Sequence, residues 1–152
     1  MANPKPFVQV ACICEKVLVE PDKVASLIRV VDTYFIELPK DPLPSNCAAV
    51  LDLTVFVSLK SGDVTGEHKI GLRLVSPDNK SQPAKEWPAE FLGGEAGVSL
   101  KVAFSMGKVT FGLYWFDVLW EGEVLTRIPF RLKAKDSEST DALVAPIETT
   151  IG

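Results

Sequence analysis

Apolar and polar residues alternate along most of the chain with a period of two, and no stretch follows the 3.6-residue period of a helix. The clearest example is residues 49–60, where every second residue from Leu51 to Leu59 is leucine or valine. Because successive side chains of a β-strand point to opposite faces, this pattern predicts a strand with one face in a core. The same reasoning predicts strands at 7–19, 25–37, 49–60, 67–75 and 97–106, and a hairpin over 111–133 that turns at 121–123.

The spacing of these segments predicts the class of fold. Seven strands with turn residues between them, or eight if the irregular residues 80–96 include another, indicate an all-β domain built as an antiparallel β-sandwich. We expect the domain to occupy residues 1–133. Residues 134–152 differ, with one lysine, four acidic residues and one apolar run at 142–147. We expect them to form a flexible acidic C-terminal tail unless that run docks onto the domain.

The strand predicted at 111–121 is apolar on both faces. One face carries Tyr114, Phe116, Val118 and Trp120, and the other carries Phe111, Leu113, Trp115 and Leu119. The first face can fill the core, but the second needs a cover, because large exposed apolar patches are rare on soluble monomers. Either the tail or another molecule supplies that cover. We therefore select Trp115, Leu113 and Leu119 as a candidate interaction face, which Phe56 extends if its strand is a neighbour.

The charge distribution argues against two classes of partner. The formal net charge is −4, and residues 134–152 carry −3 of it. No run of lysine or arginine provides the concentrated positive charge that nucleic acids and anionic membrane surfaces attract. No segment approaches the ~20 apolar residues of a transmembrane helix. We expect a chain that binds neither nucleic acid nor membrane.

The three cysteines bear on the compartment. Cys12 and Cys14 lie two residues apart on one face of a predicted strand, where their side chains run parallel and do not easily bridge, and Cys47 lies in a loop. An odd number of cysteines without a disulfide framework predicts a reducing, cytoplasmic location. Only His68 is available to join them, and the spacing matches no zinc pattern. We expect no metal and no other cofactor.

A search for catalytic groups yields weak candidates. His68 falls on the apolar face of its strand, where a structural role is favoured, and the chain lacks a nucleophile elbow and a phosphate-binding loop. Asp32, Asp52 and Asp117 interrupt apolar strands. Asp52 and Asp117 are expected on outward faces, whereas Asp32 shares a face with apolar residues and is expected to be partly buried. A carboxylate pair around Asp32 would support hydrolase chemistry, although an acid that fixes strand register is the favoured interpretation.

Three stretches of the sequence resemble a known family. They are LIRVVDTYF at 27–35, HKIGLRLVSPDNK at 68–80 and GLYWFDVLWEGEVLTRIPFRL at 112–132. The positions that carry the resemblance are Asp32, Val75–Asn79, Gly112, Tyr114, Phe116, Val118, Gly122 and Ile128–Arg131. In this pattern the chain resembles a family of uncharacterised bacterial proteins with a small immunoglobulin-like β-sandwich, except that Asn79 replaces an expected glycine. The resemblance implies an immunoglobulin-like fold and supplies no catalytic residue.

Three hypotheses for the function follow. The leading one is a non-enzymatic protein-interaction module that buries the Trp115 face against a protein partner or a copy of itself as a homodimer. The second is a β-sandwich that binds a small molecule or glycan with Trp115 or Trp120 and nearby acids, which a concave pocket would favour. The third is a hydrolase centred on Asp32.

Overall fold

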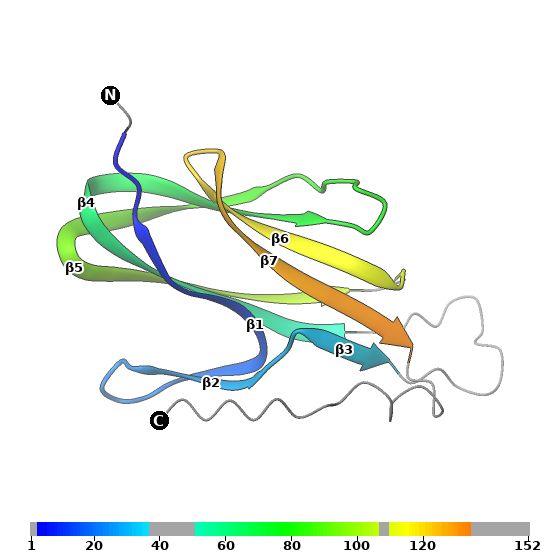
Figure 1. Ribbon diagram of the computed structural model, residues 1–152. Coiled ribbons are helices and arrows are strands. Elements are labelled where there is room, and N and C mark those ends of the chain that lie inside the picture. Colours follow the sequence, from blue (N-terminus) through cyan, green and yellow to red (C-terminus); the bar gives the residue numbers. More distant parts are fainter. Residues whose placement is uncertain (1–2, 37–50, 107–109, 135–152) are drawn as a thin grey trace, which may run out of the picture.

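The computed structural model describes residues 3–36, 51–106 and 110–134, and all regular structure in them is β-strand (Figure 1). This confirms the predicted all-β class. The strands are β1 (Phe7–Val19), β2 (Ala25–Val30), β3 (Thr33–Ile36), β4 (Leu51–Val75), β5 (Lys85–Met106), β6 (Gly112–Trp120) and β7 (Glu123–Ala134). The expected tail beyond Ala134, its apolar run at 142–147 and Cys47 lie outside the described residues.

Hydrogen bonds join all seven strands into one sheet, in the order β2–β1–β4–β6–β7–β3, with β5 paired along β4. The neighbouring strands are antiparallel except β3 and β7, which run parallel with Thr33 opposite Arg131 and Ile36 opposite Ala134. The prediction of a purely antiparallel arrangement is therefore wrong. The sheet is mixed and continuous.

The parallel pair arises because the segment expected as one strand at 25–37 divides in two. β2 pairs with β1, whereas β3 pairs with β7 at the other end of the strand order. Between them, the Val31 N–H donates to the Ile13 carbonyl at 2.7 Å, and the Arg131 N–H donates to the Asp32 carbonyl at 3.0 Å. These two bonds fix the chain first to β1 and then to β7 as it crosses between them, so that β3 runs parallel to β7.

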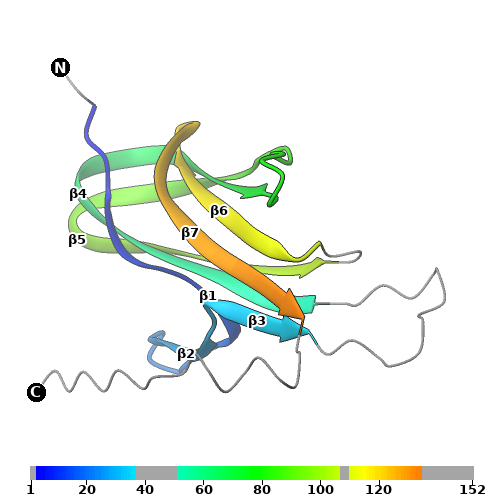
Figure 2. The same ribbon diagram turned by 45° about the vertical axis from the view of Figure 1, so that its right-hand side comes forward.

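β4 and β5 are longer than any predicted strand. The segments expected at 49–60 and 67–75 belong to one continuous β4, which pairs with β5 from Leu51–Met106 to Leu72–Lys85. The register slips between Lys60 and Thr65, where Gly62 of β4 and the facing Gly94 of β5 both have positive φ. Residues 61–66, between the two predicted strands, therefore form a bend at which β4 and β5 turn back together, at the left of Figures 1 and 2.

The bend folds the sheet over one main core. Val55 from one arm of β4, Ile70 from its other arm, and Phe116 and Phe130 from β6 and β7 all belong to the same buried cluster. The inward faces expected from the alternation at 53–59 and 114–120 are confirmed. Burial of each such side chain contributes roughly 1.5–3 kcal/mol, and this burial positions the opposite, outward face of β6.

Candidate functional site

The outward face of β6 lies between β4 and β7 and carries the residues selected from the sequence. Leu113 and Trp115 are half-buried, and Leu119 is buried. The register places Val75 of β4 and Pro129 of β7 beside Trp115. The three candidates are therefore brought together along one strand, but only Leu113 and Trp115 remain accessible.

Asp117 lies between Trp115 and Leu119 on this face and is 2% exposed. The Arg73 Nη2 donates to Asp117 Oδ2 at 2.8 Å, and the Arg127 Nε donates to Asp117 Oδ1 at 2.7 Å. Burial raises the pKa of Asp117, but the hydrogen bonds and charges of Arg127 and Arg73 outweigh it, so the net pKa lies below its ordinary value. The outward orientation expected for Asp117 is correct. Its burial, which the sequence did not indicate, comes from the two arginines of the flanking strands.

Arg127 also covers Trp115. Its guanidinium carbon lies 4.5 Å from the centre of the indole ring, which is the geometry of a cation–π contact. The cover that the doubly apolar strand requires is therefore supplied in part by a long side chain of the same sheet. The remaining part of the indole stays open.

Further basic side chains lie on the outward side of β7. Arg131 and Lys133 alternate with the buried Phe130 and Leu132 on β7, so they point outward with Arg127. Phe35 of β3 lies opposite Lys133 and is 48% exposed. We use the name Trp115 surface for Phe35, Arg73, Leu113, Trp115, Arg127, Arg131 and Lys133. Asp117 is the acid buried beneath it.

Phe56 does not extend the Trp115 surface. It is 7% exposed and packs with Cys14 and Val17 in a small separate cluster. The reason is the register of β4 with β1, which pairs Phe56 with Cys12, whereas Trp115 pairs with Val75 on the far arm of β4. Phe56 is thus a packing residue covered by the β1–β2 hairpin.

His68 takes the structural role favoured by the sequence. Its ring lies 4.7 Å from that of Trp120, its Nδ1 lies 3.0 Å from Glu121 Oε1, and its Nε2 lies 2.9 Å from the Thr65 carbonyl oxygen. The Lys69 N–H donates to the same Glu121 carboxylate and lowers the pKa of Glu121, and His68 adds to this effect. The Nδ1 contact therefore holds the β6–β7 turn against β4, and the Nε2 contact lies within β4 itself.

The hydrolase hypothesis finds no geometric support at Asp32. Its side chain is exposed rather than partly buried as expected, because the chain leaves the sheet there between β2 and β3. Within the described ranges, no group of three or more His, Cys, Asp or Glu side chains is placed to hold a metal ion. The same ranges contain no helix long and apolar enough to cross a membrane.

Cys12 and Cys14 are free thiols, one half-buried and one fully buried. Burial raises the pKa of both thiols, which lowers the fraction present as reactive thiolate. We expect Cys14 in the native protein to react with an aromatic disulfide reagent at least about tenfold more slowly than the same residue in urea. Mass spectrometry of the peptides that carry the resulting mixed disulfide measures both rates. Equal rates in both conditions would contradict the burial of Cys14.

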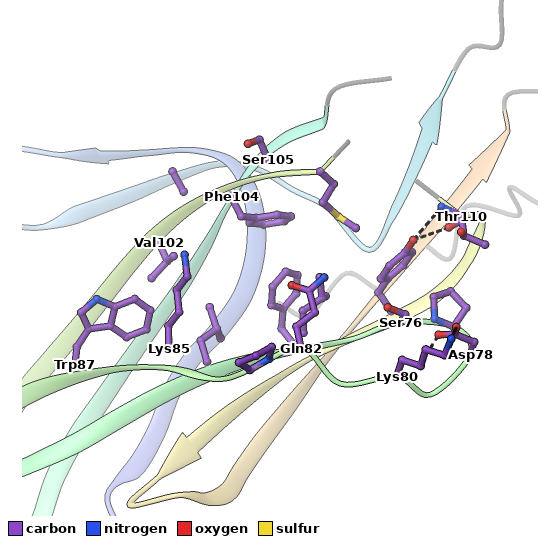
Figure 3. A pocket seen from close by; sticks show the side chains of 18 residues that line it. Ser76, Asp78, Lys80, Gln82, Lys85, Trp87, Val102, Phe104, Ser105 and Thr110 are labelled. Carbon is purple, nitrogen blue, oxygen red and sulfur yellow. Dashed lines mark hydrogen bonds and ion pairs between the residues drawn. The ribbon is translucent and has the colours of Figure 1, made fainter. Parts of the chain in front are cut away.

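The two tryptophans named in the ligand hypothesis lie in the core and on an outer sheet face. Trp120 is 5% exposed and belongs to the core, and Trp115 lies on an open face. The structure instead contains a cavity of about 620 Å³ beside Trp87, between the two arms of β5 (Figure 3). No sequence pattern indicates this cavity, because residues 80–96, which include Trp87, are irregular in their alternation.

Comparison with known proteins does not show which family this chain belongs to. No protein-family model and no curated protein matches the sequence. Among solved structures, an immunoglobulin-like protein from Pseudomonas aeruginosa is similar, with 13% identity and a TM-score of 0.41 over 88% of this chain and 100% of that chain. A likeness this distant carries no argument about activity or ligands.

Proposed function

We propose that this chain is a non-enzymatic protein-interaction module that binds its partner through the Trp115 surface. The observation that carries the proposal is the partly exposed indole of Trp115, held beneath the Arg127 guanidinium on an outer sheet face. Tryptophan and arginine dominate the energetic centres of protein interfaces. Because Arg127 is itself fixed by Asp117, these side chains are ordered before binding, which reduces the entropy lost on association.

The charge of the surface supports a partner with acidic and apolar residues. Arg73, Arg127, Arg131 and Lys133 belong to this surface, and two of them already share the carboxylate of Asp117. Complementary charge speeds association and selects partners. A second copy of the chain has a segment of this composition at 134–152, so self-association is included in the proposal.

We also propose that the module is an immunoglobulin-like sandwich of the bacterial family named above. The turn at Ser76–Asn79 supports this, since Asn79 has φ 63° at the position where that family pattern expects glycine. Asparagine enters the left-handed region more readily than most residues other than glycine. The two free thiols in the described residues support a reducing compartment such as the cytoplasm.

The test is Trp115→Glu. We expect this variant to bind its partner, or a second copy, about 30-fold more weakly, which corresponds to the loss of about 2 kcal/mol at an interface centre. Light scattering measures self-association, and affinity capture from the native cell, followed by a binding titration with the captured protein, measures a partner. Arg131→Glu, on an exposed position of the same surface, is expected to act in the same direction.

Leu92→Glu is the matched control, because Leu92 is 74% exposed on β5, away from the Trp115 surface. The Leu92→Glu substitution introduces the same negative charge at a distant position, so it should leave binding unchanged. Circular dichroism establishes that each variant is folded. Folded Trp115→Glu and Arg131→Glu proteins that keep wild-type mass and affinity would overturn the proposal.

A further inference from the structure

The cavity beside Trp87 follows from the position of β5 in the sheet. β5 pairs with β4 only, so within the described residues its other edge has no neighbouring strand. The core-facing residues Val102 and Phe104 are therefore half-buried, unlike their β4 partners Val55 and Leu53, which are at most 2% exposed. The interior of the folded sheet is open along this edge.

One part of the cavity is lined by apolar side chains, and the rest by polar and charged ones such as Ser76, Asp78 and Gln82. Leu72 and Leu74 of β4 and Phe116 of β6 belong to the apolar part together with Phe104 and Trp87 of β5. The Phe104 and Phe116 rings pack with centres 4.7 Å apart. One end is closed by Tyr114, whose hydroxyl donates to the Thr110 carbonyl at 2.7 Å and accepts from the Thr110 N–H at 3.2 Å.

A lysine stands on the core-facing side of this opening. Lys85 lies two residues before Trp87 on the same face of β5, and Figure 3 shows its side chain rising between Trp87 and Gln82 toward Val102. The other lysine of the lining, Lys80, lies 3.7 Å from the Asp78 carboxylate. Lys85 forms no ion pair with any other described residue, so the lining combines an apolar part with an ammonium group available at its rim.

We propose that this cavity binds an amphipathic carboxylate, with its acyl chain on Leu72, Phe104 and Phe116 and its carboxylate at Lys85. This site goes beyond the protein-interaction function and lies apart from the Trp115 surface. The volume of about 620 Å³ falls in the range of small-molecule sites. An ammonium without an ion-pair partner beside apolar side chains pairs with one carboxylate head, and the exclusion of water by the chain strengthens that pairing. Inward lysines on edge strands also prevent unwanted strand pairing, and the experiment separates the two roles.

The experiment is a titration of the full-length protein with dodecanoate below its micelle concentration. We expect saturable binding by calorimetry, together with a change in tryptophan fluorescence that disappears in Trp87→Phe. Lys85→Gln is expected to weaken binding about tenfold, and dodecanol is expected to bind wild type about tenfold more weakly than dodecanoate. Methyl chemical shifts of Leu74 and Val102 locate the ligand.

Lys101→Gln is the matched control, because Lys101 lies on the exposed opposite face of the same strand and does not line the cavity. It should bind dodecanoate as wild type does. The Trp115→Glu variant should also bind dodecanoate as wild type does, because Trp115 does not line the cavity. The cavity proposal is therefore tested independently of the protein-interaction proposal. Absence of saturable binding to wild type, or equal affinities for Lys85→Gln and Lys101→Gln, would overturn the proposal and leave Lys85 as an edge-protecting residue.

Discussion

Asp117→Asn should lower the free energy of unfolding by about 3 kcal/mol, the lower end of the range for breaking a buried ion pair. The substitution leaves Arg73 and Arg127 facing an uncharged amide. Their side chains are 31% and 46% exposed, so partial hydration limits the loss. Urea denaturation followed by circular dichroism measures the change. The Trp115 surface should loosen as well, since Asp117 positions the arginine that covers the indole.

The pH dependence of this effect has a defined sign. The folded-state pKa of Asp117 lies below its unfolded value, so its contribution is fully present above that unfolded value and is lost as pH falls toward the folded one. The stabilities of wild type and Asp117→Asn should therefore begin to converge as pH falls below about 4. Asp52→Asn is the control, because Asp52 is also outward on its strand but exposed, and it should change stability by less than about 0.5 kcal/mol. A difference that persists unchanged to low pH would contradict the ion-pair explanation.

Phe91→Ala should lower the free energy of unfolding by about 3–5 kcal/mol, as large-to-small changes in a core do. Phe91 is 1% exposed, and its ring packs edge-to-face on Trp120 at 5.0 Å and on His68 at 5.9 Å. The cavity left behind would remove contacts from both rings at once. Denaturant unfolding measures the loss, and tryptophan fluorescence reports the disturbance at Trp120.

The neighbouring residue provides the control for Phe91. Leu92 is 74% exposed on the same strand, so Leu92→Ala should change stability by less than about 0.5 kcal/mol. Comparable losses for the two variants would show that residues 85–92 do not pack against the core as an arm of β5.

Local alternation was sufficient to predict which faces of the central strands are buried. Val55 and Val57, and likewise Phe116 and Val118, lie inside because a two-residue period against one core leaves no other orientation. Gly62 and Gly66 separate the segments predicted at 49–60 and 67–75, and both have positive φ. They bend a continuous strand rather than end it, because the facing Gly93 and Gly94 of β5 bend at the same place.

The features that depend on distant pairing were not predictable from local pattern. Asp52 and Asp117 look alike in sequence, and only the flanking Arg73 and Arg127 make one of them buried. Phe56 looks like an outward aromatic until the β1–β2 hairpin is placed over it. Each of these outcomes is set by which strands become neighbours.

Residues 85–92 were missed for a different reason. Pro88 has no N–H to donate and therefore argues against a central strand. In the structure Pro88 lies on β5, opposite Lys69 of β4. Because β5 is paired on one side only, a missing N–H donor on its unpaired side removes no hydrogen bond of the sheet. The same arrangement opens the cavity beside Trp87.

Site-specific photo-crosslinking in the native cell tests the role of the Trp115 surface most directly. A photoreactive amino acid replaces Phe35 on that surface or, in a second protein, Leu92 on β5, since both positions are exposed. We expect position 35 to give one adduct of defined mass, with a partner protein or a second copy, and position 92 to give none. The adduct should disappear when Trp115→Glu is added to the same chain. An adduct that survives this substitution, or none from position 35, would contradict the assignment of this face as the interaction surface.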